Sequence, residues 1–212
     1  TSEWENIPNP DLFIANLIAR TKNIVLGTGV NCLPNHEPFM LAHRVAQLDH
    51  MAHGRFLWGI GAGAYVGDCE VFGYDPSTEE NRRMFRDTVD VILKIWQDPE
   101  PGVYEKWNWS FKVPEPLDSA GLRLHLKPYQ KPHPPIAVGG VSPYSSTLEF
   151  AGERGWIPMS INVVPTRVLK THWEAIEKGA SKTGVTPNRA EWRVCRDVYV
   201  AETTEQARKE AL

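Results

Sequence analysis

The sequence predicts an α/β fold in which parallel strands alternate with helices. Two observations carry this prediction: apolar runs of strand length recur along the chain, and segments with helical periodicity separate them. The strand-like runs are residues 23–33, 55–61, 134–140, 155–162 and 191–201. Strands that alternate with helices pair in parallel through right-handed crossovers. Two architectures fit this pattern, a doubly wound sheet and a (β/α)₈ TIM barrel.

The predicted helices begin at recognisable signals. Asn9, Pro10 and Asp11 combine a capping side chain, a proline in the first turn and an acid near the positive end of the helix dipole. The run from Ser77 to Glu80 matches a capping box. The predicted helices span about residues 10–20, 38–53, 77–97, 143–154, 165–183 and 204–212.

Residues 98–134 form a long connection that is rich in proline and tryptophan. Alternation in its YEKWNWSFKV stretch predicts a short hairpin. Loops of this length in compact domains usually carry function or lack order. Trp107 and Trp109 fit two roles, a hydrophobic lid over a pocket or plain loop packing. We treat residues 1–212 as one domain with 98–134 as an insertion.

The composition is ordinary for a globular protein: 212 residues, 42% hydrophobic, 23% charged, with a net charge of −3. No basic stripe favours nucleic acid, and no apolar run approaches the roughly 20 residues of a membrane span. The three cysteines form no C-x-x-C pair, and the seven histidines contain no H-E-x-x-H motif. These patterns give no reason to expect a disulfide framework or a metal site. We expect a reducing, cytoplasmic setting with no membrane or nucleic-acid partner.

The stretch FLWGIGAGAYVGD, residues 56–68, matches the dinucleotide fingerprint G-x-G-x-x-G/A by its letters. That fingerprint requires a helix to begin at the loop, because the pyrophosphate binds at the helix N-terminus. The next clear helix start is Ser77, so the context does not support dinucleotide binding.

Small residues instead mark the ends of three predicted strands, at residues 27–29, 59–63 and 139–140. A flat ligand can lie against such backbone because no Cβ intervenes. The alternative is that the glycines only ease tight turns. Because barrel sites lie at the carboxyl ends of the strands, three such ends favour a flat cofactor.

Hydroxyl side chains gather after the third of these ends, in the stretch VSPYSSTLEFAGERG. Hydroxyls, backbone N–H groups and a helix dipole together make an anion site. Ordinary capping explains one hydroxyl but not four. The four are Ser142, Ser145, Ser146 and Thr147. A phosphate is plausible there.

Four stretches resemble the bacterial luciferase-like family of flavin-dependent monooxygenases, which are (β/α)₈ barrels. They are NIVLGTGVNCLPNHEP, AHRVAQLDHMAHGRFLWGIGAGAYVGDCEVFG, KPHPPIAVGGVSPYSSTLEFAGERG and IPMSINV. The combination of LDHMAHGRF with G-x-G…D-x-x-x-FG is rather specific to this family. Within it, the chain is most similar to limonene-monooxygenase-like and alkanal-monooxygenase-like members.

The resemblance implies an FMN-dependent monooxygenase that receives reduced flavin from a separate flavin reductase. It would use O₂ on a small apolar organic substrate. The resemblance also implies a homodimer, joined through the helices after the second and third strands. Two alternatives stay open: a deazaflavin-dependent oxidoreductase of the same superfamily, and a non-catalytic luciferase-like flavoprotein subunit.

The family pattern also implies which residues touch the cofactor. Gly29 and Val30 match a non-prolyl cis peptide under the flavin ring. At the position of Ala62, luciferase has an arginine that binds the phosphate. The implied cofactor contacts are Thr28, Gly29, Val30, Gly61, Ala62, Gly139, Gly140, Ser142, Tyr144 and Ser145.

Candidates for catalysis are fewer. Tyr65 and Asp68 follow the fourth barrel strand and are candidates for lining the substrate pocket, and His36 is a candidate to reach the active site. The family's chief catalytic histidine lies in an EHH motif that we expect upstream of Thr1. In this register the chain carries about the third to seventh strands, so we expect an incomplete barrel with exposed edges.

Overall fold

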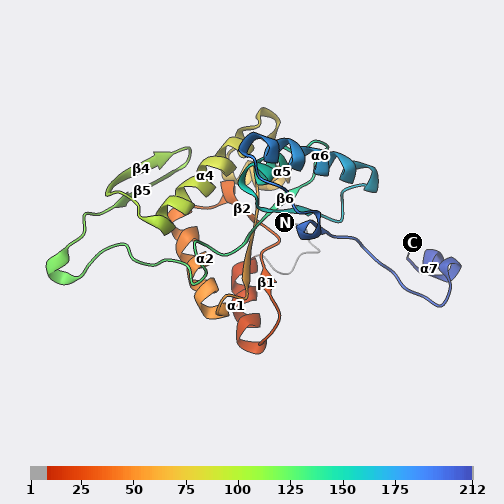
Figure 1. Cartoon of the computed structure of the whole chain (residues 1–212), viewed down its shortest axis with the longest axis horizontal. Helices are drawn as coiled ribbons and strands as arrows, with labels where there is room; N and C mark the ends of the chain where they lie inside the picture. Colours follow the sequence, from red (N-terminus) through yellow and green to blue (C-terminus); the bar gives the residue numbers. More distant parts are fainter. Residues whose placement is uncertain (1–8, 212) are drawn as a thin grey trace.

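The computed structural model describes residues 9–211, in which a curled, open parallel sheet carries helices on one face (Figure 1). The sheet order is β1 (Leu26–Gly27), β3 (Phe56–Gly61), β6 (Ile136–Gly140), β7 (Ile157–Ser160) and β8 (Arg193–Val194), and β2 (Asn31–Cys32) also pairs with β3. All of these pairings are parallel. The helices are α1 (Pro10–Arg20), α2 (Pro38–Ala52), α3 (Val66–Phe72), α4 (Glu80–Gln97), α5 (Ser146–Arg154), α6 (Thr166–Thr183) and α7 (Thr204–Glu210).

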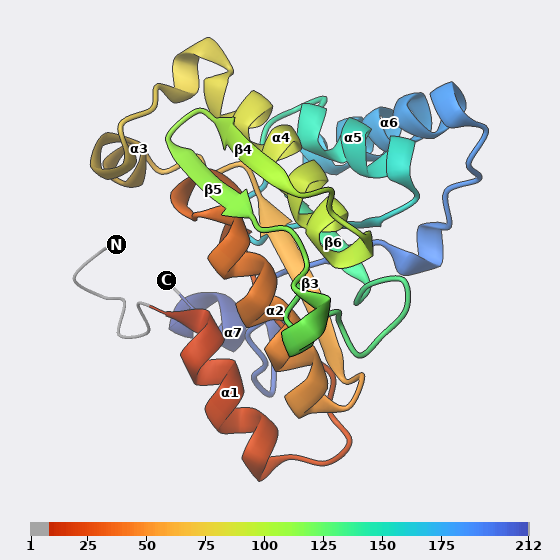
Figure 2. The same ribbon diagram turned by 90° about the vertical axis from the view of Figure 1, so that its left-hand side faces the viewer.

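The strand order decides between the two predicted architectures. It follows the chain from β1 to β8 without reversing, whereas a doubly wound sheet reverses its order at a switch point. Residues that face the helices alternate along β3 with residues that face the open side. Phe56, Trp58 and Ile60 are fully buried against α2 and α4, and Figure 2 shows both helices beside β3. The doubly wound alternative is therefore wrong, and the sheet is of the barrel type.

A break divides the first predicted strand, residues 23–33, into β1 and β2. The Gly29–Val30 peptide within this break is cis, as the resemblance implied. Thr28 spans the break: its hydroxyl donates to the Gly59 carbonyl (2.7 Å) and accepts from the Gly59 N–H (2.9 Å). A Cβ atom at Gly59 would lie 1.8 Å from the carbonyl oxygen of Thr28, so this close approach requires glycine.

The helices after β3 differ from the prediction in two ways. Helix α3, a short helix that directly follows the glycine loop, was not predicted. Helix α4 begins at Glu80 rather than at Ser77. Asp75 explains the shift, because its carboxylate accepts from the Ser77 N–H (2.8 Å) and caps a separate 3₁₀ turn, Pro76–Thr78.

The last predicted strand, residues 191–201, is mostly irregular. Only Arg193–Val194 pair with β7, and the chain then leaves the sheet toward α7 (Figure 1). An edge strand has a partner on one side alone, so its pairing ends where the neighbouring strand β7 ends at Ser160.

The predicted hairpin in the insertion is confirmed as β4 (Gly102–Lys106) and β5 (Trp109–Val113). It packs over the outer side of α4 (Figure 2). The Trp107 indole donates to Asp87 of α4 (2.8 Å), and Lys106 pairs with the same carboxylate (2.8 Å). Trp109 is buried beside Phe111. These contacts favour the packing role of both tryptophans over the lid role.

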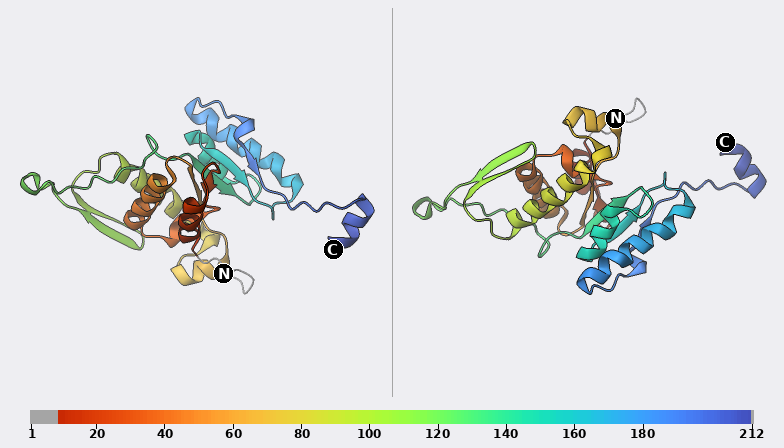
Figure 3. Two further views of the ribbon diagram at one scale, coloured as in Figure 1. Left: turned by 90° about the horizontal axis from the view of Figure 1, so that it is seen from below. Right: turned by 90° about the horizontal axis from the view of Figure 1, so that it is seen from above.

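Helices α5 and α6 lie side by side in unusually close contact (Figure 3). A Cβ atom at Gly179 would lie 1.8 Å from the Glu149 carbonyl oxygen, and one at Gly152 would lie 2.2 Å from the Ile176 carbonyl oxygen. Lys182 bridges Glu149 (2.5 Å) and Glu153 (2.6 Å) across the same crossing. Within residues 9–211, no helix is both long and apolar enough to cross a membrane.

This crossing predicts a large effect from one methyl group. In the full-length protein, Gly179→Ala should lower the free energy of unfolding by about 3 kcal/mol, because the two backbones must separate. Urea unfolding at neutral pH measures the change. Ser181→Ala, at an exposed position of the same helix, is the control and should stay within about 0.5 kcal/mol of wild type. Equal stability of the two variants would show that the crossing tolerates a side chain.

Candidate functional site

A cavity of about 390 Å³ opens at the carboxyl ends of β2, β3 and β6. In a parallel barrel-type sheet this is the edge where active sites are built. The lining comes from the ends of these strands, the loop after β3, the loop between β6 and α5, the start of α4 and the residue after β7. The lining residues include Gly29, Val30, Cys32, Gly61, Ala62, Gly63, Ala64, Asn81, Arg82, Gly139, Val141, Ser142, Ser145, Thr147 and Ile161.

Glycines and one valine form a flat, apolar part of this cavity. A Cβ atom at Gly61 would lie 2.8 Å from Val30 Cγ2, and one at Gly139 would lie 3.5 Å from Val30 Cγ1. Val30 therefore lies against both glycines, and Gly29 has open space where a Cβ would stand. Gly29, Gly61 and Gly139 meet in one cavity, as the sequence predicted.

The hydroxyl groups at the start of α5 are held by an ordered chain of hydrogen bonds. Ser145 is the N-cap residue: its hydroxyl accepts from the Leu148 N–H (3.4 Å) and bonds Thr147 Oγ1 (2.9 Å). Thr147 Oγ1 in turn donates to the Gly139 carbonyl (2.9 Å). The buried Ser146 Oγ has no hydrogen-bond partner among the described residues. This end of the cavity therefore presents hydroxyls beside a helix N-terminus, an arrangement that suits an anion.

A cation reaches the same cavity from α4. Arg82 carries the only charged side chain among the described residues that line it, and it forms an exposed ion pair with Glu79. One turn further along α4, Arg86 Nη2 donates to the Ser146 carbonyl (3.4 Å). Residues four apart share a helix face, so Arg82 lies on the α4 face that meets the start of α5.

Asn81, next to Arg82, is buried and also lines the cavity. Its amide donates to the Gly63 carbonyl (2.7 Å), which ties the glycine loop after β3 to α4. Its Oδ1 atom is buried without a partner among residues 9–211. Sequence reasoning missed Asn81 and Arg82. The only signal for Arg82 was its four-residue spacing from Arg86.

Several predicted site residues lie outside the cavity. Thr28 is buried and its hydroxyl is used by Gly59. A Cβ at Gly140 would lie 2.5 Å from the Leu148 side chain, so this glycine serves packing of α5 on the sheet. Tyr144 and Tyr65 are exposed, and neither lines the cavity. The structure thus places Thr28 and Gly140 in packing contacts and Tyr65 and Tyr144 at the surface, and their cofactor and pocket roles stay predictions.

His36 belongs to a polar network beneath α1 and α2 and not to the cavity. Its Nδ1 atom accepts from Arg44 (3.4 Å), and Arg44 Nε donates to the buried Asp11 (3.1 Å). Burial and the neighbouring Arg44 charge lower the pKa of the His36 imidazole below its ordinary value, and Asp11 partly opposes them. The imidazole is therefore neutral at pH 7.

Cys32 lines the cavity, and the charge of Asp68 of α3 affects the pKa of its thiol. Burial raises the pKa of the Cys32 thiol, and the Asp68 charge raises it further. The thiol therefore stays protonated near neutral pH, which favours apolar lining over nucleophilic chemistry.

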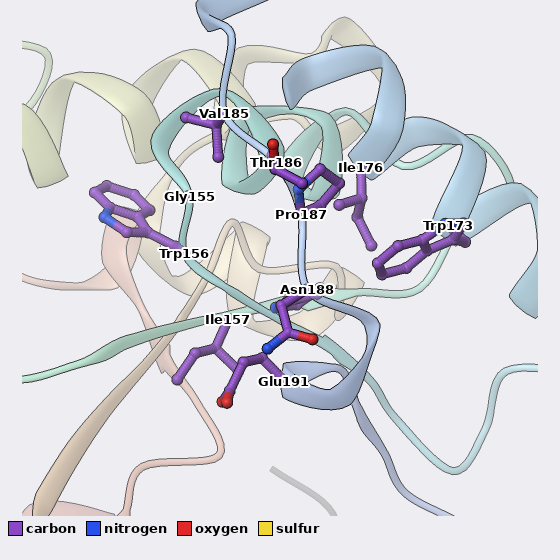
Figure 4. A pocket seen from close by; sticks show the side chains of 12 residues that line it. Gly155, Trp156, Ile157, Trp173, Ile176, Val185, Thr186, Pro187, Asn188 and Glu191 are labelled. Atoms are coloured by element: carbon purple, nitrogen blue, oxygen red, sulfur yellow. The ribbon is translucent and has the colours of Figure 1, made fainter. Parts of the chain in front are cut away.

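A second cavity, of about 120 Å³, lies at the opposite ends of the strands (Figure 4). Trp156 and Ile157 at the start of β7, Trp173 and Ile176 of α6, and Pro187 line it. The amino ends of the strands in such folds serve stability. We therefore take the larger cavity at the carboxyl ends as the candidate site.

Comparison with known proteins identifies the family of this chain. The family model for luciferase-like monooxygenases matches residues 1–212. The chain belongs to this family. The resemblance stated from the sequence motifs is thereby confirmed.

Luciferase-like relatives share about a third of the sequence. 4-hydroxyprotoasukamycin monooxygenase of Streptomyces nodosus is 38% identical over 96% of this chain and 53% of its own length. Limonene 1,2-monooxygenase of Rhodococcus erythropolis is 34% identical over 96% of this chain and 50% of its own. The oxygenase component of a flavin-dependent trigonelline monooxygenase of Acinetobacter baylyi is 32% identical over 94% and 52%. The chain thus spans about half the length of these relatives.

A solved luciferase-like structure has the same fold. The oxygenating constituent of 3,6-diketocamphane monooxygenase from Pseudomonas putida, in complex with FMN, superposes with a TM-score of 0.85. It is 35% identical, and the match covers 97% of this chain and 57% of that one.

The His36 network predicts a pH dependence of stability. An imidazole whose pKa is lowered on folding makes the unfolded state bind more protons below about pH 6.5. The free energy of unfolding should therefore fall as the pH drops below 6.5, by up to about 1.4 kcal/mol per pH unit for this group. His36→Asn should fall less steeply in urea unfolding at pH 7.5, 6.5 and 5.5. Parallel slopes in the two proteins would contradict the prediction.

Proposed function

We propose that the protein is the oxygenase component of a two-component monooxygenase that uses reduced FMN and O₂ on a small apolar organic substrate. The observation that carries the proposal is the cavity at the carboxyl ends of β2, β3 and β6, with its flat glycine surface and its hydroxyl-lined end. The named monooxygenase relatives and the FMN complex of the structural relative support it.

The residues present fit a flavin. A volume of about 390 Å³ lies within the range of ligand pockets. Val30, Gly61 and Gly139 provide the flat apolar surface that a planar ring needs. Bound reduced FMN would supply the electrons that activate O₂. The chain's own task is to hold the ring, orient it and keep water away from it.

The phosphate would be held at the start of α5. Ser142, Thr147 and the N-cap residue Ser145 line this end of the cavity. Arg82 would supply the positive charge that Ala62 lacks. Its ion pair with Glu79 is exposed, and such pairs contribute about 0–1 kcal/mol, so a phosphate can displace the carboxylate.

The substrate would lie among apolar side chains. Besides Val30, the cavity exposes Ala62, Ala64, Val141 and Ile161. Such a lining favours a small organic molecule with few polar groups and excludes water from the reacting centre. A terpene or an aldehyde fits this description.

The partners follow from the same proposal. A separate flavin reductase would deliver the reduced cofactor, which the name of the trigonelline oxygenase component supports. A homodimer would cover apolar side chains that α1 and α2 expose, namely Leu12 (71%), Phe13 (44%) and Met40 (55%). In the whole protein, the open sheet would close into a (β/α)₈ barrel of the luciferase-like type.

Oxygen uptake tests the proposed function. The full-length protein, supplied with FMN, NADH and an FMN reductase, should consume O₂ in the presence of a terpene or aldehyde substrate. Gly139→Leu should abolish this uptake because its side chain enters the cavity. Gly139→Ala, whose Cβ stands at ordinary contact distance from Val30, should retain most of it.

Three results would overturn the proposal. Activity with reduced deazaflavin alone would indicate a hydride-transferring oxidoreductase. Flavin binding without oxygen uptake would indicate a non-catalytic subunit. Full uptake by a folded Gly139→Leu protein would place the flavin elsewhere.

Arg82 gives a sharper prediction about the phosphate. Arg82→Ala should weaken FMN binding about tenfold, because a charge-assisted hydrogen bond is lost, and leave riboflavin binding unchanged. Quenching of flavin fluorescence measures both dissociation constants. Arg83→Ala, on the neighbouring helix position that contacts Trp107, is the matched control. Equal losses for FMN and riboflavin would remove Arg82 from the phosphate site.

A further inference from the structure

The loop between β6 and α5 has a demanding conformation. Tyr144 adopts a left-handed backbone conformation with φ of +49°, which non-glycine residues rarely take. This loop carries Ser142 and leads into Ser145, so its shape sets the hydroxyl-lined end of the cavity. Two consecutive residues of α6, Thr171 and His172, bond its backbone.

Thr171 holds one side of the loop. Its hydroxyl accepts from the Tyr144 N–H (3.2 Å) and donates to the Val168 carbonyl within α6 (2.7 Å). The hydrogen on the hydroxyl is committed to the helix, so the oxygen faces the loop as an acceptor. A side chain without a hydroxyl leaves the Tyr144 amide to water.

His172 holds the other side from a fully buried position. Its Nε2 atom lies 3.0 Å from the Ser142 carbonyl oxygen, and a carbonyl can only accept, so Nε2 carries a hydrogen. Its Nδ1 atom then accepts from the Ser160 hydroxyl of β7 (2.8 Å), whose oxygen accepts from the Trp192 indole (3.0 Å). Burial lowers the pKa of His172, which agrees with a neutral ring.

Helix α6 can transmit this constraint because it is fixed against α5. The backbones meet at Gly152 and Gly179, and Lys182 bridges two acids of α5. The loop therefore leads from β6 into α5 and is bonded along its length by α6, and these two helices are fixed to each other. Its bonds to α6 are already formed in the structure without a ligand.

We propose that Thr171 and His172 position the β6–α5 loop for binding of the flavin phosphate. This inference rests on the proposed function, since it assigns the phosphate to this loop. Thr171 and His172 are positioning residues, because they bond only the backbone of the loop. The cavity itself is lined by the loop residues Ser142 and Ser145. The contribution is preorganisation: the loop has the binding shape before the ligand arrives.

Thr171→Val in the full-length protein is the primary test, because valine keeps the shape and removes the acceptor. The FMN dissociation constant should rise about fivefold, and that of riboflavin should not change. Thr171→Ser should restore the preference for FMN over riboflavin. Thr183→Val removes a hydroxyl from the other end of the same helix, where it bonds the Glu153 carbonyl, and should leave the preference unchanged.

His172→Gln and His172→Leu extend the test. Glutamine can still donate to the Ser142 carbonyl and should retain most of the FMN preference, whereas leucine should lose it about tenfold or more. If His172→Leu does not fold, Thr171→Val still decides the question. Amide hydrogen exchange of residues 141–145 without flavin should be several-fold faster in Thr171→Val than in wild type.

The outcomes separate this proposal from the proposed function. If wild type does not prefer FMN over riboflavin, the proposed phosphate site fails. If wild type prefers FMN but Thr171→Val keeps the full preference, the positioning role is overturned. Unchanged exchange of residues 141–145 in Thr171→Val would overturn it independently of any flavin.

Discussion

The two hydrogen bonds between Thr28 and Gly59 are the contact on which the candidate site depends. They join the break between β1 and β2 to the middle of β3, and they form only because Gly59 has no side chain. Beyond this contact the chain turns through Gly29 and sets Val30 against Gly61 and Gly139. The flat surface of the cavity thus comes from backbone contact between neighbouring strands.

A second unit completes the cavity from the other side. Helices α5 and α6 are fixed to each other at Gly152 and Gly179, and together they bound the loop that carries the hydroxyl groups. Arg86 of α4 bonds the Ser146 carbonyl, which places α4 beside the same loop. In the proposed function, the strands would supply a surface for a planar group, and the helices would supply polar groups for an anion. This division matches the two chemical halves of a flavin nucleotide.

The sequence predicted the parts of this arrangement that depend on local patterns. Buried strands appear as apolar runs, and Gly61 and Gly139 mark strand ends that need no side chain. One helix cap was recognisable among the four hydroxyl residues between 142 and 147, but not that Ser145 forms it. Residues whose role depends on direction could not be assigned. Thr28 and Gly140 are next to residues that line the cavity, but alternate positions of a strand face opposite sides of the sheet. The break before β2 also interrupts this alternation, so the sequence does not show which side Thr28 faces.

The other site features depend on contacts between segments that are distant in the sequence. A helix start at Ser77 would place Arg82 in the second turn of α4, whereas the observed start at Glu80 places it in the first turn, beside the cavity. His172 looked like one histidine among seven, since its partners Ser142 and Ser160 are 30 and 12 residues away. No local pattern encodes such a pairing.

The position of Arg82 bears on how the site would respond to its ligand. A cation at the end of a strand, where Ala62 stands, would lie inside the cavity whether or not an anion were present, and its desolvation would cost stability. Arg82 instead reaches the cavity from the first turn of a helix and pairs with Glu79 in a solvent-exposed contact. Exposed pairs are weak, whereas a guanidinium bonded to a phosphate makes a strong, directional contact. When a phosphate replaces Glu79 as the partner of Arg82, the bound state would therefore be favoured, and the free protein would lose little stability.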